Sequence, residues 1–267
     1  MFRKILFLIV LAALATGPAA AQPKKKRILA IGQSNGFQHD AVSDGLATLY
    51  RLGKETGLWD TYIRTDAQLI TKKKLDGNAK NLDYFDAVFF YTTGELSMDD
   101  EQKADLIKFV KEDGKGFLGS HSAIDTFYKW PEYGEMVGGY FDGHPWNQFQ
   151  APIIVEDRNF PATKHLPERF SIMDEIYQAK SFSRDRVRVL MRMDPDQIDL
   201  TRKGVNRTDR DFAVAWVRNY GKGRVFYSTF GHRTEVWERP DIRQMWIEAA
   251  KWVLKLTDGD AMPRPKP

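Results

Sequence analysis

Residues 115–125 constrain the fold most, because they combine a buried strand with a sharp turn that carries a histidine. Phe117 supplies part of the apolar strand, and Gly119 and Ala123 are small residues two positions on either side of His121. In α/β-hydrolases and related enzymes, small residues at these positions permit an elbow that lifts a side chain off the end of a sheet. The pattern predicts His121 at a strand end, as a metal ligand, as a proton-transfer group, or as a cap without chemistry.

Apolar segments alternate with helical patterns through the first half of the chain. This β-α-β-α-β order predicts an α/β fold with a doubly wound, mostly parallel, flavodoxin-like sheet. A C-terminal hairpin and a final helix are expected after further strands. The predicted strands are residues 27–32, 59–65, 85–91, 115–120, 153–155 and 187–191, the hairpin is 212–230, and the helices are 42–57, 97–114 and 242–256.

The N-terminus has the pattern of a secretory signal. Basic residues precede an apolar run and an Ala-x-Ala site, which predicts a signal peptide over residues 1–21 and a single mature domain over residues 22–267. We therefore expect an exported, periplasmic or extracellular protein without stable membrane insertion. The net charge of +4 falls to +2 without Arg3 and Lys4, which gives little reason to expect a nucleic-acid partner. The oligomeric state is left open.

The chain contains no cysteine, so disulfides, thiolate nucleophiles and cysteine-bound zinc are excluded. Histidine is the remaining candidate for chemistry. His39, His121 and His232 each follow a predicted strand, and His144 lies in the loop beyond the elbow. Because the carboxyl ends of parallel strands meet at one edge, we expect a cluster that binds a zinc-like divalent metal or transfers protons. His165 is expected in a surface loop, and no nucleotide cofactor is expected.

Two carboxylates are candidates for the same site. Asp125 stands four residues after His121, so one helical turn would place both on one face. The pattern Ser122-x-x-Asp125 also fits a capping box, which would make Asp125 structural. Glu175 is a candidate general acid or base, and an ordinary surface carboxylate is its alternative.

Residues 126–146 are rich in aromatic residues and glycine and show little periodicity. A long loop in a compact domain is often functional. Its rings could stack on a sugar or pack the rim of a cleft, and we expect at least one of them to contact substrate. The candidates are Trp130, Tyr133, Tyr140 and Trp146.

Several motifs together resemble the ThuA-like, or trehalose-utilisation, family over nearly the whole mature chain. They are Gly119-x-His121-x3-Asp125, Trp130-Pro131-x-Tyr133-Gly134, Gly139-x-Phe141-x-x-His144-Pro145, Val155-Glu156-Asp157, Asp174-Glu175-x-Tyr177 and Gly223-Arg224-Val225-Phe226-Tyr227-x-x-x-Gly231-His232.

The resemblance implies a class I glutamine amidotransferase-like fold and a link to carbohydrate metabolism. His121 replaces the amidotransferase cysteine, while His232 and Glu235 resemble that enzyme's late His-Glu pair, so glutamine hydrolysis through a thioester is not available. Phe160 and Phe212 stand where the family pattern suggests histidines, which implies that the substrate differs from trehalose or its oxidised derivatives.

Two functions compete at this point. The leading expectation is an exported enzyme that acts on a small-molecule carbohydrate, a glycoside or keto-sugar, by hydrolysis, elimination or isomerisation. In it His121, His232, Glu175 and Asp125 are catalytic and the histidines can hold a metal. The alternative is a non-catalytic carbohydrate-binding or accessory protein that kept the cleft without the nucleophile.

Overall fold

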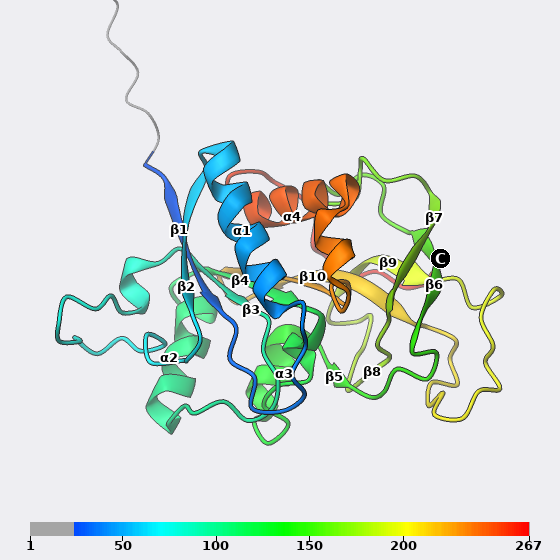
Figure 1. Ribbon diagram of the computed structural model, residues 1–267, viewed down its shortest axis with the longest axis horizontal. Coiled ribbons are helices and arrows are strands. Elements are labelled where there is room, and N and C mark those ends of the chain that lie inside the picture. Colours follow the sequence, from blue (N-terminus) through cyan, green and yellow to red (C-terminus); the bar gives the residue numbers. More distant parts are fainter. Residues whose placement is uncertain (1–23, 267) are drawn as a thin grey trace, which may run out of the picture.

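The computed structural model describes residues 24–266. Its central element is a nine-stranded mixed sheet (Figure 1). The predicted signal peptide, residues 1–21, lies outside the described residues, and the assignment of residues 22–267 to one domain stays a prediction. The strand order is β2-β1-β3-β4-β11-β10-β9-β6-β7. These strands are β1 (Lys26–Ile31), β2 (Trp59–Arg64), β3 (Ala87–Phe90), β4 (Gly116–Ser120), β6 (Gln148–Val155), β7 (Arg169–Glu175), β9 (Arg188–Met193), β10 (Ala213–Tyr220) and β11 (Gly223–Ser228).

Five neighbouring strands, β2, β1, β3, β4 and β11, are mutually parallel and form the core of the sheet. Their order corresponds to the 2-1-3-4-5 arrangement of flavodoxin-like folds, which confirms the predicted fold class. The continuous apolar run of residues 27–32 suggests a central strand, but the structure places β1 second from the edge, between β2 and β3. Such a run indicates that both faces of the strand are covered, and it does not fix the position of the strand within the sheet.

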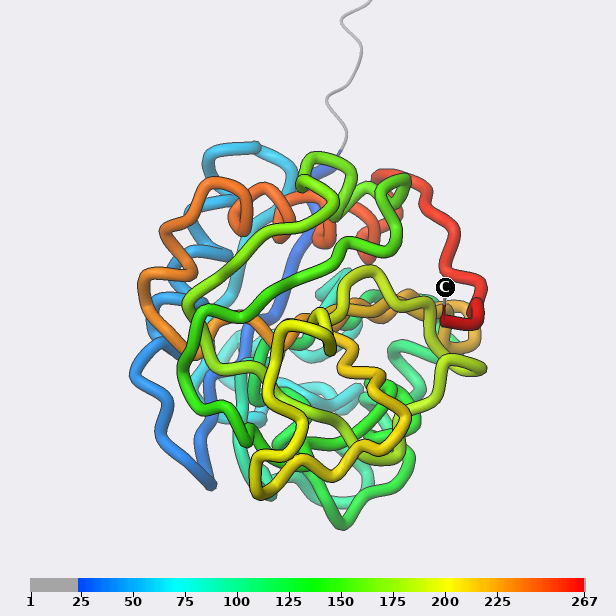
Figure 2. Tube along the Cα trace, turned by 90° about the vertical axis from the view of Figure 1, so that its right-hand side faces the viewer, coloured from blue at the N-terminus to red at the C-terminus, as the bar shows by residue number. Residues whose placement is uncertain are grey.

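The other half of the sheet is antiparallel. The predicted hairpin is present as β10 and β11, and β9, β6 and β7 continue from it in antiparallel pairs. This extension lies at one end of the molecule, on the right in Figure 1 and nearest the viewer in Figure 2. A separate two-stranded sheet joins β5 (Tyr140–Phe141) to β8 (Ala179–Lys180).

Helices cover both faces of the parallel core, as a doubly wound fold requires (Figure 1). Helices α1 (Val42–Thr56) and α4 (Pro240–Val253) share one apolar cluster with Ile28. Helices α2 (Asp100–Lys111) and α3 (Pro131–Val137) share the other with Leu29. Both side chains are fully buried, which explains why the first strand reads as a continuous apolar run.

Two local predictions need correction. Helix α2 begins after Asp99 rather than at the predicted residue 97, because Asp99 forms a reciprocal capping box with Gln102. Residues 126–146 are not wholly irregular, since they contain α3 and β5. Helix α3 has only seven residues, with Gly134 inside it and a left-handed Gly138 at its end, so it carries too little apolar periodicity to be recognised.

Short 3-10 helices occur at η1 (Leu82–Tyr84), η2 (His121–Ile124) and η3 (Thr234–Glu238). The second of these forms the turn that follows β4. Within residues 24–266, every helix is too short or too polar to pass through a bilayer.

Candidate functional site

His121 is the first residue after β4, at the predicted elbow. Its φ of +42° lies in the left-handed region, which residues other than glycine rarely adopt. Two groups of the neighbouring segment hold it there. The hydroxyl of Tyr227 donates to the His121 carbonyl at 2.7 Å, and His121 Nδ1 lies 2.7 Å from the carbonyl oxygen of Thr229. Because a carbonyl only accepts, Nδ1 carries the hydrogen and the Nε2 lone pair is free.

His232 lies on the turn that follows β11. The buried carboxylate of Asp174 accepts hydrogen bonds from the backbone N–H groups of Gly231 at 2.7 Å and Arg233 at 3.1 Å, one on each side of His232. Gly231 has a φ of +124°, and a Cβ atom there would lie 2.8 Å from the ring of Trp237. The turn therefore requires glycine, and Asp174 fixes the direction in which His232 leaves it.

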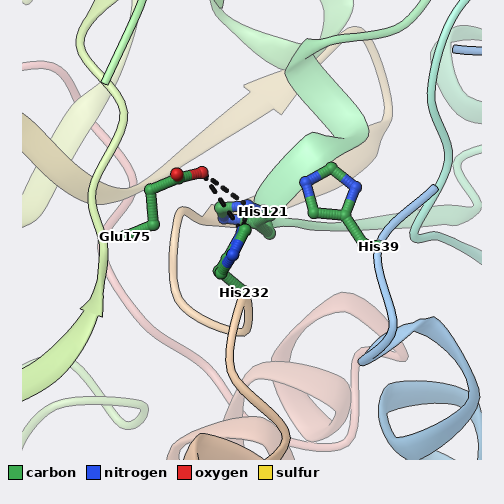
Figure 3. Close-up of side chains that lie close together, drawn as sticks. All are labelled: His39, His121, Glu175 and His232. Atoms are coloured by element: carbon green, nitrogen blue, oxygen red, sulfur yellow. Dashed lines mark hydrogen bonds and ion pairs between the residues drawn. The ribbon is translucent and has the colours of Figure 1, made fainter. Parts of the chain in front are cut away.

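The structure brings together His39, His121, Glu175 and His232, whose ligand atoms all lie within 4.8 Å of one another (Figure 3). His121 Nε2 is 3.2 Å from His232 Nδ1, and Glu175 Oε2 is 3.1 Å from His232 Nδ1 and 3.6 Å from His121 Nε2. His39, His121 and His232 lie in the segments that follow β1, β4 and β11, and Glu175 is the last residue of β7. The edge where parallel strands end therefore gathers imidazoles that are far apart in the sequence.

Burial and mutual charge set the protonation of the cluster. Burial, reinforced by the charges of His121 and His232, lowers the pKa of His39 to about 3, so this imidazole is neutral at neutral pH. Burial alone would raise the pKa of Glu175, but the adjacent imidazoles of His121 and His232 lower it well below its ordinary range. Burial would lower the pKa of His232, and the adjacent Glu175 instead raises it. The carboxylate is thus ionised, and it favours the protonated form of His232.

Gln148 determines which nitrogen of a neutral His232 carries its proton. Arg233 donates to Gln148 Oε1 at 2.8 Å, so the Gln148 amide nitrogen is directed at His232 Nε2, 3.0 Å away. The Nε2 atom must accept this hydrogen bond, which leaves the proton on Nδ1, facing Glu175.

A cavity of about 290 Å³ opens beside the cluster. Three members of the cluster, His39, Glu175 and His232, line it together with Asp125 and His144. His144 lies outside the four-residue set that was expected to include it. Its Nδ1 is 3.4 Å from Glu175 Oε1, and its side chain is 41% exposed. His144 can therefore orient Glu175 from the solvent side, while Glu175 takes the place expected for His144 among the clustered ligand atoms.

Asp125 faces the cavity and does not form the alternative capping box. Its side chain accepts from Tyr128 Oη at 2.5 Å, and Ser122 Oγ is buried without a hydrogen-bond partner. Burial raises the pKa of Asp125, although the Tyr128 hydrogen bond opposes the shift. His165 is exposed, as expected, and its Nε2 lies 2.9 Å from the Asp241 carbonyl.

The four aromatic residues expected to meet substrate are buried, and none of them lines this cavity. The hydroxyl of Tyr133 donates to the carbonyl of Ala123, and the indole N–H of Trp146 donates to that of Asp199. The expectation that these rings stack on a sugar in this cavity is corrected, because they pack the interior, and the polar atoms of Tyr133, Tyr140 and Trp146 are already paired. The buried rings are Trp130, Tyr133, Tyr140 and Trp146.

Different aromatic side chains form the cavity wall: Phe37, Phe141 and Tyr177. The Tyr177 ring packs on His121 with centroids 4.1 Å apart, and its hydroxyl lies 3.2 Å from His39 Nε2. Burial raises the pKa of Tyr177 well above its ordinary value. The sequence does indicate that Tyr177 lies near the site, because Tyr177 stands two residues after Glu175 and residues at this spacing in an extended segment point to the same face. The sequence held no comparable signal for Phe37.

Phe160 and Phe212, which stand where family histidines were expected, are core residues. Phe160 packs against Trp252, and Phe212 packs against Trp146. Neither lines the cavity beside the cluster.

This fold and site define a class of protein with a glutamine amidotransferase-like α/β fold and a histidine at the elbow. A glutamine amidotransferase from Thermotoga maritima superposes with a TM-score of 0.50 at 14% identity, over 86% of this chain and 98% of that one. A ThuA-like protein from Bacteroides uniformis superposes with a TM-score of 0.71 at 21% identity, over 89% of this chain and 94% of that one. A ThuA-like protein from Parabacteroides merdae superposes with a TM-score of 0.66 at 18% identity, over 86% of this chain and 90% of that one.

The chain belongs to the ThuA family, whose model, described as trehalose utilisation, matches residues 27–253. The comparison with curated proteins finds no match. The family description points to a carbohydrate-related role.

Proposed function

We propose that the protein is an enzyme that acts on a glycoside or keto-sugar by hydrolysis, elimination or isomerisation, assisted by a divalent metal. One observation carries the proposal. Three imidazoles and a carboxylate converge beside a cavity whose walls also include three aromatic rings. Ligand sites of this kind combine apolar walls with a few convergent polar groups.

The separations in the cluster fit a metal centre. Ligands at about 2.0–2.1 Å from a tetrahedral ion lie about 3.3 Å from one another. The contacts among His121, His232 and Glu175 are 3.1–3.6 Å. The Nδ1 hydrogen bond of His121 to a carbonyl also leaves the other nitrogen free to coordinate, as is usual for metal-bound histidine. When bound, such an ion would polarise a carbonyl or lower the pKa of bound water.

The remaining cavity residues would handle protons and position the sugar. Asp125 borders the cavity and has a raised pKa, which suits a side chain that gives and regains a proton. His144 would orient Glu175. Phe141 and Tyr177 would pack against the C–H groups of a sugar ring.

The decisive experiment combines elemental analysis with a substrate screen. Protein purified without chelator is analysed for zinc and other divalent metals, then incubated with trehalose, other disaccharides and keto-sugars while products are detected. We expect about one metal ion per chain and turnover of at least one sugar. The double variant His121→Ala/His232→Ala should lose both. His165→Ala, which removes an exposed histidine outside the cluster, should retain both.

Metal-free protein, together with full activity in the double variant, would overturn the proposal. Sugar binding without any product would instead favour the non-catalytic carbohydrate-binding protein.

Export is a further part of the proposal and rests on the sequence of residues 1–21. N-terminal sequencing of the protein recovered from cell fractions should find a mature chain that begins near Gln22. An intact Met1 terminus in the cytoplasmic fraction alone would exclude it.

A further inference from the structure

Phe37 is the most exposed aromatic side chain among residues 24–266, at 63% exposure. It lies at the mouth of the candidate site, on the loop between β1 and α1. An exposed phenyl ring is unremarkable when it stands alone on a surface. This ring differs because its backbone is fixed and because it borders the site.

The loop that carries Phe37 is held against the turn that follows β3. The Thr93 hydroxyl donates to the Phe37 carbonyl at 2.8 Å and accepts from the Gly36 N–H at 3.3 Å. Gly94 packs so closely that a Cβ on it would lie 2.8 Å from the Gly36 nitrogen. The Gln38 side chain also donates to carbonyls within its own loop. The loop therefore presents an apolar ring to solvent in a defined position.

The ring is aligned with the cluster. Phe37 meets His39 edge to face at a centroid distance of 4.7 Å, and His39 meets His121 at 4.8 Å. Phe37 thus lies on the outer side of the chain of rings that leads to the elbow histidine.

Phe37 also borders two neighbouring cavities. The inner one, of about 290 Å³, has Phe141 and Tyr177 in its walls. The outer one, of about 360 Å³, is lined by polar residues that include Gln148 and Arg233. Both cavities share Phe37, His39 and His232. The inner volume is at the small end of ligand pockets, about 300–1,000 Å³, so a substrate larger than one sugar ring can extend past Phe37 into the outer cavity.

We infer that Phe37 is a specificity-determining residue that stacks on the second, outer unit of a two-unit carbohydrate substrate. The inference rests on the proposed function, because it assumes that the inner cavity holds the reacting sugar. The outer ring would place its C–H face on Phe37 and its hydroxyl groups toward the polar residues of the outer cavity.

The test compares Phe37→Ala and Phe37→Trp with the wild type. Tyr50→Ala is the matched control, since Tyr50 is another exposed aromatic residue, on α1, and lines neither cavity. Calorimetry measures the Kd of each protein for trehalose, maltose, cellobiose and sucrose, and for glucose as the single ring. Metal content and Tm are measured for every variant.

Phe37→Ala should weaken binding of the preferred disaccharide by roughly 3- to 10-fold, the range expected for one stacked ring. Binding of glucose should weaken less than binding of the disaccharide, because Phe141 and Tyr177 still line the inner cavity, and the metal content and Tm should be unchanged. Phe37→Trp should restore disaccharide binding, and Tyr50→Ala should match the wild type throughout.

Two results would overturn the inference while leaving the proposed function intact: wild-type disaccharide affinity in Phe37→Ala, or an equal loss for glucose and the disaccharide. Absence of any sugar binding by the wild type would remove the proposed function, and this inference with it.

Discussion

Gln148 donates a hydrogen bond to His232, with 3.0 Å between the amide nitrogen and Nε2. This contact holds the proton of neutral His232 on Nδ1, the atom that faces Glu175 and His121. A metal ion bound at Nδ1 would have to displace that proton, so Gln148 opposes the tautomer that coordination needs.

Gln148→Glu should therefore tighten metal binding. A carboxylate accepts a hydrogen from Nε2, which stabilises the tautomer with a free Nδ1, and outer partners of this kind change metal affinity by about 10–100-fold. We expect the Kd for zinc to fall by about tenfold in a competition titration with a chromogenic chelator. Gln150→Glu adds the same charge on the same strand and should have no comparable effect. Equal effects of the two substitutions would show that charge alone acts.

Metal removal should lower the thermal stability of the protein. A ligand that binds only the folded state stabilises it by about 2.7 kcal/mol at a hundredfold excess over Kd. Scanning calorimetry with zinc and with a chelator should give a higher Tm with zinc for the wild type. The shift should be largely lost in His121→Ala and kept in His165→Ala. A similar shift in all three proteins would place the ion elsewhere.

The pKa of His39 predicts a loss of stability in acid. Burial, followed by the charges of His121 and His232, lowers this pKa from 6.5 to about 3. Between these values the unfolded chain binds a proton that the folded chain does not, so stability falls as the pH drops below 6.5 toward 3.

Urea unfolding of metal-free protein at pH 7.5 and pH 5 measures this effect. The wild type should lose about 1–2 kcal/mol more than His39→Asn, which cannot titrate. Groups that titrate equally in both proteins cancel in the difference. An identical loss in the two proteins would show that His39 is protonated in the folded state.

Glu156 should be important for stability rather than for chemistry. Its carboxylate is 1% exposed and accepts two hydrogen bonds from Arg184, at 2.8 and 2.9 Å. Breaking one partner of such a buried pair costs about 3–5 kcal/mol. Glu156→Gln should lose about this much in urea unfolding.

Glu168→Gln is the matched control, because Glu168 is an exposed carboxylate 3.9 Å from Arg158. Exposed pairs contribute about 0–1 kcal/mol. Similar losses for the two variants would indicate that the Arg184 pair contributes no more than a surface contact.

Most of the parallel core could be predicted from the sequence, because its inner strands are buried on both faces. Continuous apolar runs mark β1, β3 and β4. Strand β7 gave no such run, since it lies at the edge of the sheet and alternates exposed and buried residues. The sequence therefore predicts no strand over residues 169–175, although this strand ends in Glu175.

The gathering of histidines followed from topology alone, because parallel strands end at one edge. The cavity walls did not, since composition shows that residues 126–146 are aromatic but not which way each ring points. Tertiary packing turned Trp130 and Tyr133 inward. Phe37, in a loop between a predicted strand and a predicted helix, lies at the cavity mouth.

The four clustered side chains come from segments spread over most of the chain, and β11 enters the sheet between β4 and β10 only after every other strand has been synthesised. A chain that stops before that strand has neither His232 nor the carbonyl group that orients His121. The cluster is thus completed only late in the synthesis of the polypeptide, after β11 has left the ribosome. A substitution far from the cavity that weakens the insertion of β11 between β4 and β10 should therefore also disturb the cluster.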